Sequence, residues 1–175
     1  MLFLSGCDRG SQLSGALEFR NRLLDSNGCT FQANITADYG ENIYRFSLLC
    51  CFDQAGTMSF EVLSPDTIKG ITGTVSKEQG ALTFDDEVLL FELLADDQLT
   101  PVNGPWVLMN ALRSGYIQCC GKDGNNLKVM LDDSYDENAF HVDVWLSQDL
   151  APVTADIFWQ NRRILAIEIA SFSYL

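Results

Sequence analysis

The sequence predicts an α+β protein in which about ten antiparallel strands, joined as a meander, are accompanied by two helices. Three observations lead to this fold class. Residues 11–26 have helical periodicity, the residues after Gly28 alternate between apolar and polar side chains, and residues 105–114 form a short apolar helix in mid-chain. The sequence has no internal repeat and no low-complexity linker, so we expect residues 8–175 to form a single domain.

The first helix is predicted from apolar residues at helical spacing. Polar and charged side chains occupy most of the other positions, as in a helix that packs one side on a protein core. Asn27-Gly28 is expected to end this helix, because glycine is the preferred residue just past a helix C-terminus. The apolar stripe consists of Leu13, Leu17 and Leu24 with the neighbouring Ala16, Phe19 and Leu23.

The strands are predicted from apolar residues that recur at every second position, which is typical of a strand with one buried face. Short turns separate these runs, and strands joined by short turns pair in antiparallel fashion. Residues 87–94 are densely apolar, and their periodicity fits a strand or a helix equally well. The predicted strands lie within residues 31–37, 44–52, 58–62, 68–74, 81–84, 116–120, 127–131, 140–146, 153–159 and 164–172.

The mid-chain helix lacks a polar face. Pro105 stands in a favourable position for the first turn, and Ser114-Gly115 ends the segment. A helix that is apolar nearly all round has to be enclosed, by protein or by something else. Its side chains therefore either pack as ordinary core or contact a hydrophobic ligand. The candidates for ligand contact are Trp106, Met109 and Leu112.

Composition excludes several classes of function. The chain has 24 acidic and 11 basic side chains, which gives a net charge of −13. A nucleic-acid-binding protein needs a cationic surface for the phosphates, and anionic membranes also attract cations, so this charge disfavours both kinds of direct binding. Hydrophobic residues make up 47% of the chain, which favours an ordered fold over disorder. No stretch approaches the roughly 20 apolar residues that cross a bilayer.

The first seven residues resemble the lipobox of bacterial lipoproteins. The apolar run Met1-Leu2-Phe3-Leu4 is followed at once by Ser5-Gly6-Cys7, and small residues before the cysteine suit a signal-peptidase cleft. The resemblance implies that Cys7 is lipidated with fatty acyl chains such as palmitate and becomes the mature N-terminus. A complete signal peptide contains roughly 7–15 apolar residues, so we expect residues 1–7 to be a truncated lipoprotein signal.

Five cysteines follow Cys7, and an odd number of cysteines cannot all pair within one chain. Two of the sites are adjacent doublets in predicted strands, where neighbouring side chains point to opposite faces, so one member of each doublet should face the core. A single disulfide between the doublet strands and retained thiols are both compatible with the sequence. No C-x-x-C motif is present, which disfavours a zinc site. The five are Cys29, Cys50, Cys51, Cys119 and Cys120.

Residues that could support catalysis do not form a recognisable motif. The single histidine, His141, alternates with valines in a predicted strand, and no G-x-S-x-G elbow is present. Glycine motifs that bind phosphate are also missing. The acidic segment 132–138 could coordinate calcium, but it lacks the spacing of an EF-hand loop, and we interpret it as a solvated hairpin turn. We therefore expect no catalytic residue, metal or cofactor.

The lipobox, the first helix, the long meander and the apolar mid-chain helix together resemble the LolA/LolB/LppX lipoprotein-carrier superfamily. Local similarities are Ser64-Pro65-Asp66 after a strand, Leu99-Thr100-Pro101 before the mid-chain helix, and Pro152 at the start of the penultimate strand. The carriers proper have an Arg-Pro pair where this chain has Ser64-Pro65. The resemblance therefore extends to the fold but does not imply the specific role of carrying lipoproteins.

The resemblance implies an antiparallel half-open β-barrel whose concave face is covered by helices and encloses a cavity for acyl chains. Phe46 and Leu48 share one face of a predicted strand and would line this cavity together with Trp106, Met109 and Leu112. The expected protein is an exported lipoprotein, anchored through Cys7 on the extracytoplasmic side of the cell envelope, that binds or carries a lipid or another amphiphile. The alternative is a non-catalytic sensor or protein-interaction module with an envelope protein as its partner.

Overall fold

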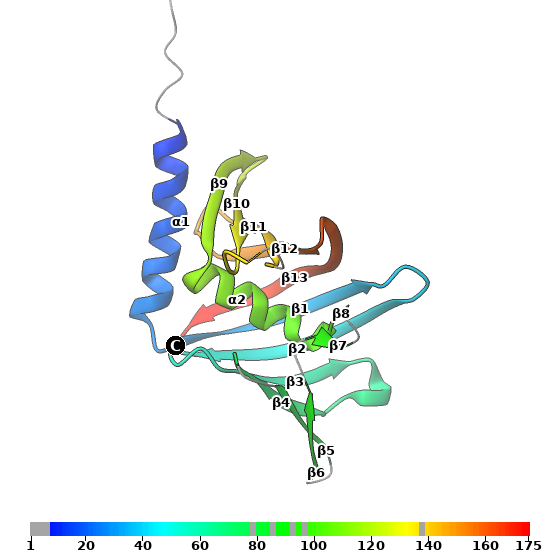
Figure 1. The fold of residues 1–175 in the computed structure, drawn as a ribbon. Coiled ribbons are helices and arrows are strands. Elements are labelled where there is room, and N and C mark those ends of the chain that lie inside the picture. Colours follow the sequence, from blue (N-terminus) through cyan, green and yellow to red (C-terminus); the bar gives the residue numbers. More distant parts are fainter. Residues whose placement is uncertain (1–7, 78–79, 85–86, 92–93, 96–97, 137–138) are drawn as a thin grey trace, which may run out of the picture.

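The backbone forms one curved antiparallel sheet with two helices (Figure 1). The computed structural model describes residues 8–77, 80–84, 87–91, 94–95, 98–136 and 139–175. The helices are α1 (Asp8–Asp25) and α2 (Gly104–Ser114), with short 3-10 helices η1 (Asp66–Ile68) and η2 (Pro101–Asn103). The strands are β1 (Gly28–Asp38), β2 (Ile43–Asp53), β3 (Met58–Ser64), β4 (Thr72–Val75), β5 (Gly80–Phe84), β6 (Glu87–Phe91), β7 (Leu94–Ala95), β8 (Gln98–Leu99), β9 (Tyr116–Asp123), β10 (Asn126–Asp132), β11 (His141–Leu146), β12 (Pro152–Trp159) and β13 (Arg162–Tyr174).

The sheet is an open meander. Its eleven strands lie in the order β6-β5-β4-β3-β2-β1-β13-β12-β11-β10-β9, and β7 pairs only with β8. The first and last strands, β1 and β13, are antiparallel neighbours at the centre of the sheet. Within the described part of the chain, the edge strands β6 and β9 do not pair with each other. The predicted α+β fold, an antiparallel half-open barrel with two helices, is therefore confirmed.

Helix α1 buries a different side of its surface from the one that its leucine spacing suggested. Phe19 and Leu23 are fully buried, whereas Leu13, Leu17 and Leu24 are each more than 40% exposed. The helix packs mainly beside β9 and β10 at one end of the sheet, as Figure 1 shows. Neither described helix is long and apolar enough to cross a bilayer.

The described part of the apolar segment 87–94 forms strands rather than a helix, with Leu94 in β7. Its residues Glu87–Phe91 make up β6, which pairs with β5 on one side only. No strand of the described chain pairs with the outer edge of β6. Val88, Leu89 and Leu90 are 63%, 63% and 59% exposed, so neither face of β6 is covered by the core. The weak run predicted at residues 68–74 is likewise divided, because η1 occupies its beginning and β4 its end.

Candidate ligand-binding site

Helix α2 lies across the concave side of the sheet (Figure 1) and packs against β2, β10, β12 and β13. Every residue from Gly104 to Met109 is buried, and Trp106, Met109 and Leu112 are at most 5% exposed. The helix begins at Gly104-Pro105 and ends before Gly115, as the sequence predicted. The sheet and α1 thus enclose this helix, which explains why it has no polar face.

Arg20 of α1 holds the C-terminal end of α2. Its guanidinium donates hydrogen bonds to the carbonyl oxygens of Leu112 and Gly115, both at 2.8 Å, and to that of Ala111 at 3.4 Å. The last carbonyl groups of a helix have no partner within the helix, so Arg20 supplies the missing donors. Burial lowers the pKa of Arg20, but a guanidinium remains a cationic donor at neutral pH.

Two further contacts connect α2 to the turn between β2 and β3. The indole Nε1 of Trp106 donates to the carbonyl oxygen of Gly56 at 2.9 Å. At the other end of the helix, Arg113 donates to the carbonyl oxygen of Gln54. Polar contacts therefore fix α2 near both of its ends, while apolar side chains fill the interface between them.

The apolar face of β2 continues beyond the part that α2 covers. Phe46 pairs with the buried Ile35 and Tyr44 with the buried Ala37, so both aromatic side chains lie on the core-facing side of the sheet. Their rings stack with centroids 6.4 Å apart, and Tyr44 is 46% exposed. Leu48, two residues further along the same face, is completely buried. An accessible aromatic surface thus leads into the covered core.

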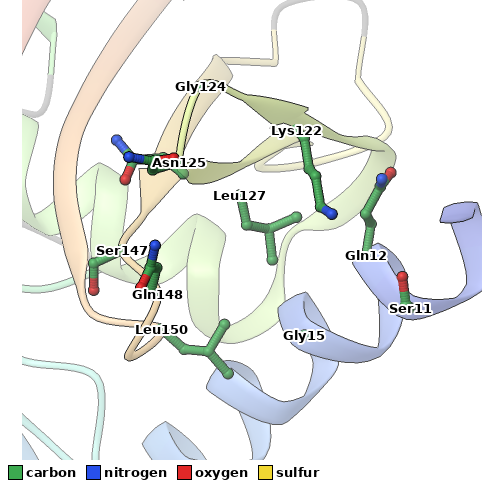
Figure 2. Close-up of a pocket in the computed structure, with 11 residues that line it drawn as sticks. Ser11, Gln12, Gly15, Lys122, Gly124, Asn125, Leu127, Ser147, Gln148 and Leu150 are labelled. Atoms are coloured by element: carbon green, nitrogen blue, oxygen red, sulfur yellow. The ribbon is translucent and has the colours of Figure 1, made fainter.

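A pocket of about 390 Å³ lies between α1 and the β9–β10 hairpin, beside the loop between β11 and β12. Figure 2 shows Leu127 and Leu150 pointing into the space beside Gly15 of α1. Lys122 and Gln12 stand on one side of this space, while Ser147, Gln148 and Asn125 stand on the other. The pocket therefore combines an apolar floor with a polar rim that carries one amine.

The pocket brings together residues that sequence reasoning did not select. None of the five predicted lining residues, Phe46, Leu48, Trp106, Met109 and Leu112, borders it. The one local signal was Gly15 within a helical pattern, because glycine inside a helix often marks a close approach. The assignment of a ligand cavity to the predicted residues stays a prediction. Cys7, the predicted lipidation site, lies outside the described residues.

His141 belongs to a network of polar side chains on the opposite, convex face of the sheet. Its Nδ1 lies 2.8 Å from Asp132 Oδ1, and its Nε2 lies 3.0 Å from Asp143 Oδ1. The other oxygen of Asp143 lies 2.7 Å from Lys128 Nζ. Both partners of the imidazole are carboxylates, which can accept but not donate hydrogen bonds when ionised. These contacts give His141 a structural environment rather than that of a general base beside a nucleophile.

Hydrogen bonds from neighbouring segments hold the acidic turn after β10 in place. Asp132 accepts a hydrogen bond from Gln118, and Asp133 accepts one from the Phe140 backbone amide at 2.8 Å. Burial raises the pKa of Asp133. Among the described residues, no group of three or more His, Cys, Asp or Glu side chains is arranged to hold a metal ion. Glu137 and Asn138, which the sequence analysis included in this segment, lie outside the described residues.

The described cysteines are free thiols with different environments. In the first doublet Cys50 is 1% exposed and Cys51 is partly exposed, and in the second Cys119 is exposed while Cys120 packs against the core. The expected alternation is thus present. Strands β2 and β9, which carry the doublets, are separated in the sheet by β1, β13, β12, β11 and β10. The disulfide considered between them does not form.

We expect alkylation at pH 8 to distinguish these thiols. Burial raises the pKa of Cys29 to about 12 and raises that of Cys50 as well, so both remain protonated and enclosed at pH 8. Thiolates are the reactive species, and the exposed Cys119 should therefore react with iodoacetamide first. Peptide mass spectrometry after a short reaction would measure the order. Cys29 and Cys50 should react only in urea, and rapid modification of Cys50 in the folded protein would contradict the assigned burial.

Comparisons with known proteins find the fold but no sequence relative. No protein-family model matches the chain, and no curated protein sequence matches it. An uncharacterized conserved protein from Thermus thermophilus aligns with a TM-score of 0.51 and 8% identity, over 93% of this chain and 87% of that one. A LolA superfamily protein from Nitrosomonas europaea aligns with a TM-score of 0.48 and 9% identity, over 94% and 92% of the two chains.

An outer membrane lipoprotein-sorting protein domain from Vibrio parahaemolyticus aligns with a TM-score of 0.49 and 8% identity, over 94% of this chain and 92% of that chain. At such identities the likeness concerns the fold alone. The half-open antiparallel barrel described above agrees with the fold that the sequence resemblance implied.

Proposed function

We propose that the protein is an exported lipoprotein, tethered to a membrane through Cys7, that binds a lipid or another amphiphile on the concave side of its half-barrel. Helix α2 is the movable cover of this site. The mechanism is sequestration without a covalent step or a cofactor. The protein resides on the extracytoplasmic side of the cell envelope.

One observation carries this proposal, namely the continuous apolar face of β2. Tyr44 exposes it at one end, the half-buried Phe46 follows, and Leu48 continues it into the buried core. An acyl chain that enters beside Tyr44 and Phe46 would take the place of the apolar side chains of α2 against the sheet. The new contacts are as apolar as the ones they replace. Burying the chain is worth roughly 25 cal/mol per Å² of apolar surface removed from water, which favours binding as the helix moves aside.

Native mass spectrometry of the full chain, purified from a bacterial host without detergent, tests the proposal. We expect a mass excess that disappears on denaturation and matches an extractable lipid, whereas a lipid joined covalently to Cys7 would remain after denaturation. Met109→Gln, which places a polar group of similar size in the fully buried interface, should remove the excess. A clean apo mass, without uptake of added fatty acid or phospholipid, would exclude lipid binding.

Met130→Gln is the matched control for this substitution. Met130 alternates along β10 with the buried Val129 and Leu131, so its side chain lies on the convex face, away from α2. It should retain the bound lipid. Equal loss in both variants would indicate general destabilisation rather than a contact with the ligand.

A second candidate is a non-catalytic sensor or protein-interaction module of the cell envelope. Strand β6 favours it, because Val88, Leu89 and Leu90 are exposed at an edge of the described sheet, where no strand pairs with the outer side of β6. Such an edge can accept a strand from a partner protein. Leu89→Lys should weaken that pairing and leave lipid uptake unchanged, so co-purification of a partner with the two forms distinguishes the candidates.

A further inference from the structure

We infer that the pocket between α1 and the β9–β10 hairpin binds an uncharged sugar ring. The pocket has a volume of about 390 Å³, near the lower end of the roughly 300–1,000 Å³ that small-molecule sites occupy. It therefore suits a single sugar residue better than a whole lipid. The sugar can belong to a free saccharide or to the headgroup of a glycolipid, and only the second source rests on the function proposed above.

The side chains around the pocket have unused hydrogen-bonding capacity. Gln12, Asn125 and Gln148 line it with carboxamides. Within the described part of the chain, none of these three carboxamides hydrogen-bonds to another group of the protein. A carboxamide has both N–H donors and an acceptor oxygen. A ligand that displaces water from the pocket has to satisfy these donors and acceptors in its place.

The charge of the lining favours a neutral ligand. Among the described residues that border the pocket, none is an aspartate or a glutamate, and Lys122 is the one cation. Lys122 already engages another group of the protein. A charged ligand would therefore lose hydration without gaining an opposite charge. Hydroxyl groups are neutral and both donate and accept hydrogen bonds, as carboxamides do.

The shape of the pocket selects a ring with hydroxyl groups around its edge. Figure 2 shows Gln12 on one side of the space, with Asn125 and Gln148 on the other. Leu127 and Leu150 point into the space and form an apolar floor. A sugar ring has the same division, because its C–H face is apolar while its hydroxyl groups radiate from the perimeter. A ring that lies on the leucines directs hydroxyl groups toward the carboxamides on both sides.

Gly15 of α1 leaves room for this ring. A Cβ atom at Gly15 would lie 3.0 Å from Cδ2 of Leu127 and 3.5 Å from Cδ2 of Leu150. Glycine is unfavourable inside a helix, and one that stands there often marks a close approach. A longer side chain at this position would occupy the floor on which the sugar lies.

Proton–nitrogen correlation NMR of the full chain tests the inference, because it records the side-chain NH2 groups of asparagine and glutamine directly. The probes are the methyl glycosides of glucose, galactose and mannose. We expect at least one of them to shift the NH2 signals of Gln12, Asn125 and Gln148 with a dissociation constant of about 1 mM, as for a small ligand held by a few neutral hydrogen bonds. Unshifted signals with all of the glycosides would overturn the inference.

Charged and peptide-like probes test the chemical class of the ligand. Glucuronate is an anion and glucosamine a cation, and we expect both to bind more weakly than the neutral glycosides, because the pocket has no unpaired charge to offer them. Acetyl-leucine N-methylamide presents peptide groups and an apolar side chain, and it should also bind more weakly. Tighter binding of any of these probes than of every neutral glycoside would refute the assignment of a sugar.

Two glycine variants locate the binding on the leucine floor. Gly15→Met extends a side chain across this floor and should abolish glycoside binding. Gly10→Met on the same helix should bind normally, because nothing lies within 4 Å of its Cβ position. Glycoside binding that survives in Gly15→Met would place the sugar elsewhere and overturn the inference.

Two glutamine variants test the polar rim and keep the experiment decisive if Gly15→Met does not fold. Gln148 is exposed, and Gln148→Leu removes its carboxamide while keeping a side chain of similar size. We expect glycoside affinity to fall about fivefold, as for one lost neutral hydrogen bond. Gln54→Leu is the control, because Gln54 is an exposed glutamine in the turn between β2 and β3 and does not line the pocket. Equal affinity in Gln148→Leu and Gln54→Leu would refute the inference.

An octyl form of the glycoside that binds, used below its aggregation limit, identifies the source of the sugar. A glycolipid headgroup should gain about tenfold in affinity over the methyl glycoside from burial of the first carbons on the floor. Equal affinity of the two forms would identify a free saccharide. The two proposals can also fail separately. A clean apo mass with intact glycoside binding would refute the lipid-binding function, whereas lipid uptake without any glycoside binding would refute the sugar site.

Discussion

Gly28→Ala should lower the free energy of unfolding by about 2–5 kcal/mol, the sum of left-handed backbone strain and overpacking. Gly28 has a φ angle of +135° where the chain leaves α1 and enters β1. A Cβ atom there would lie 2.2 Å from the carbonyl oxygen of Phe52 and 3.0 Å from Cα of Asp53. Because both contacts are with the backbone of β2, relief would require the two strands to separate at the centre of the sheet. Urea unfolding, followed by tryptophan fluorescence, measures the loss.

Gly70→Ala is the matched control for the Gly28 substitution. Gly70 also has a positive φ angle, +86°, but its Cβ position has no atom within 4 Å. Only backbone strain should therefore act there, and the expected loss is about 1–2 kcal/mol. Equal losses at both glycines would show that the close approach of β2 is not what requires glycine at position 28.

The alternating part of the fold could be predicted because its signals are local. Hydrophobic side chains at every second position placed β1, β2 and β3 with the correct face inward, and Phe31, Leu48 and Phe60 are buried as that pattern requires. Pro105 likewise marked the first turn of α2 correctly.

The curvature of the sheet and the covering of its edges have no comparable local signal. Leu89 faces the same side of the sheet as the core but remains 63% exposed, because the core ends before β6. In α1, Leu17 and Phe19 are both apolar, but Phe19 is the buried one, with its ring beside those of Phe172 and Tyr174 of β13. Such outcomes depend on where distant elements meet, which spacing along the chain does not specify.

The same reason explains why the pocket and the attachment of α2 were missed. Gln12, Leu127 and Leu150 come from three distant parts of the chain and meet only after the sheet has curved. Arg20 and its acceptor Leu112 are 92 positions apart. The sequence shows that α2 must be enclosed, but it does not show which side chains hold it in place.

Arg20→Met is expected to loosen the cover of the proposed site. The substitution keeps much of the apolar length of the side chain but removes the donors to the carbonyl groups of Leu112 and Gly115. Leaving such acceptors without a partner costs about 1–3 kcal/mol each when they are buried, so we expect unfolding free energy to fall by roughly 2–4 kcal/mol. Hydrogen exchange at the last turn of α2 should accelerate more than exchange in β1 or β13.

Arg22→Met separates this effect from the loss of any positive charge on α1. Arg22 is exposed and forms an ion pair with Glu18, one turn earlier on the same helix, and such pairs contribute only about 0.3–0.5 kcal/mol. Hydrogen exchange in α2 should therefore remain unchanged in Arg22→Met. If opening of α2 limits lipid uptake, Arg20→Met should also take up added lipid faster, and Arg22→Met should not. Unaltered exchange at the end of α2 in Arg20→Met would show that the apolar contacts of Trp106, Met109 and Leu112 hold the helix without help. Faster exchange without faster uptake would separate the two roles: Arg20 would hold α2, but α2 would not be the cover through which lipid enters.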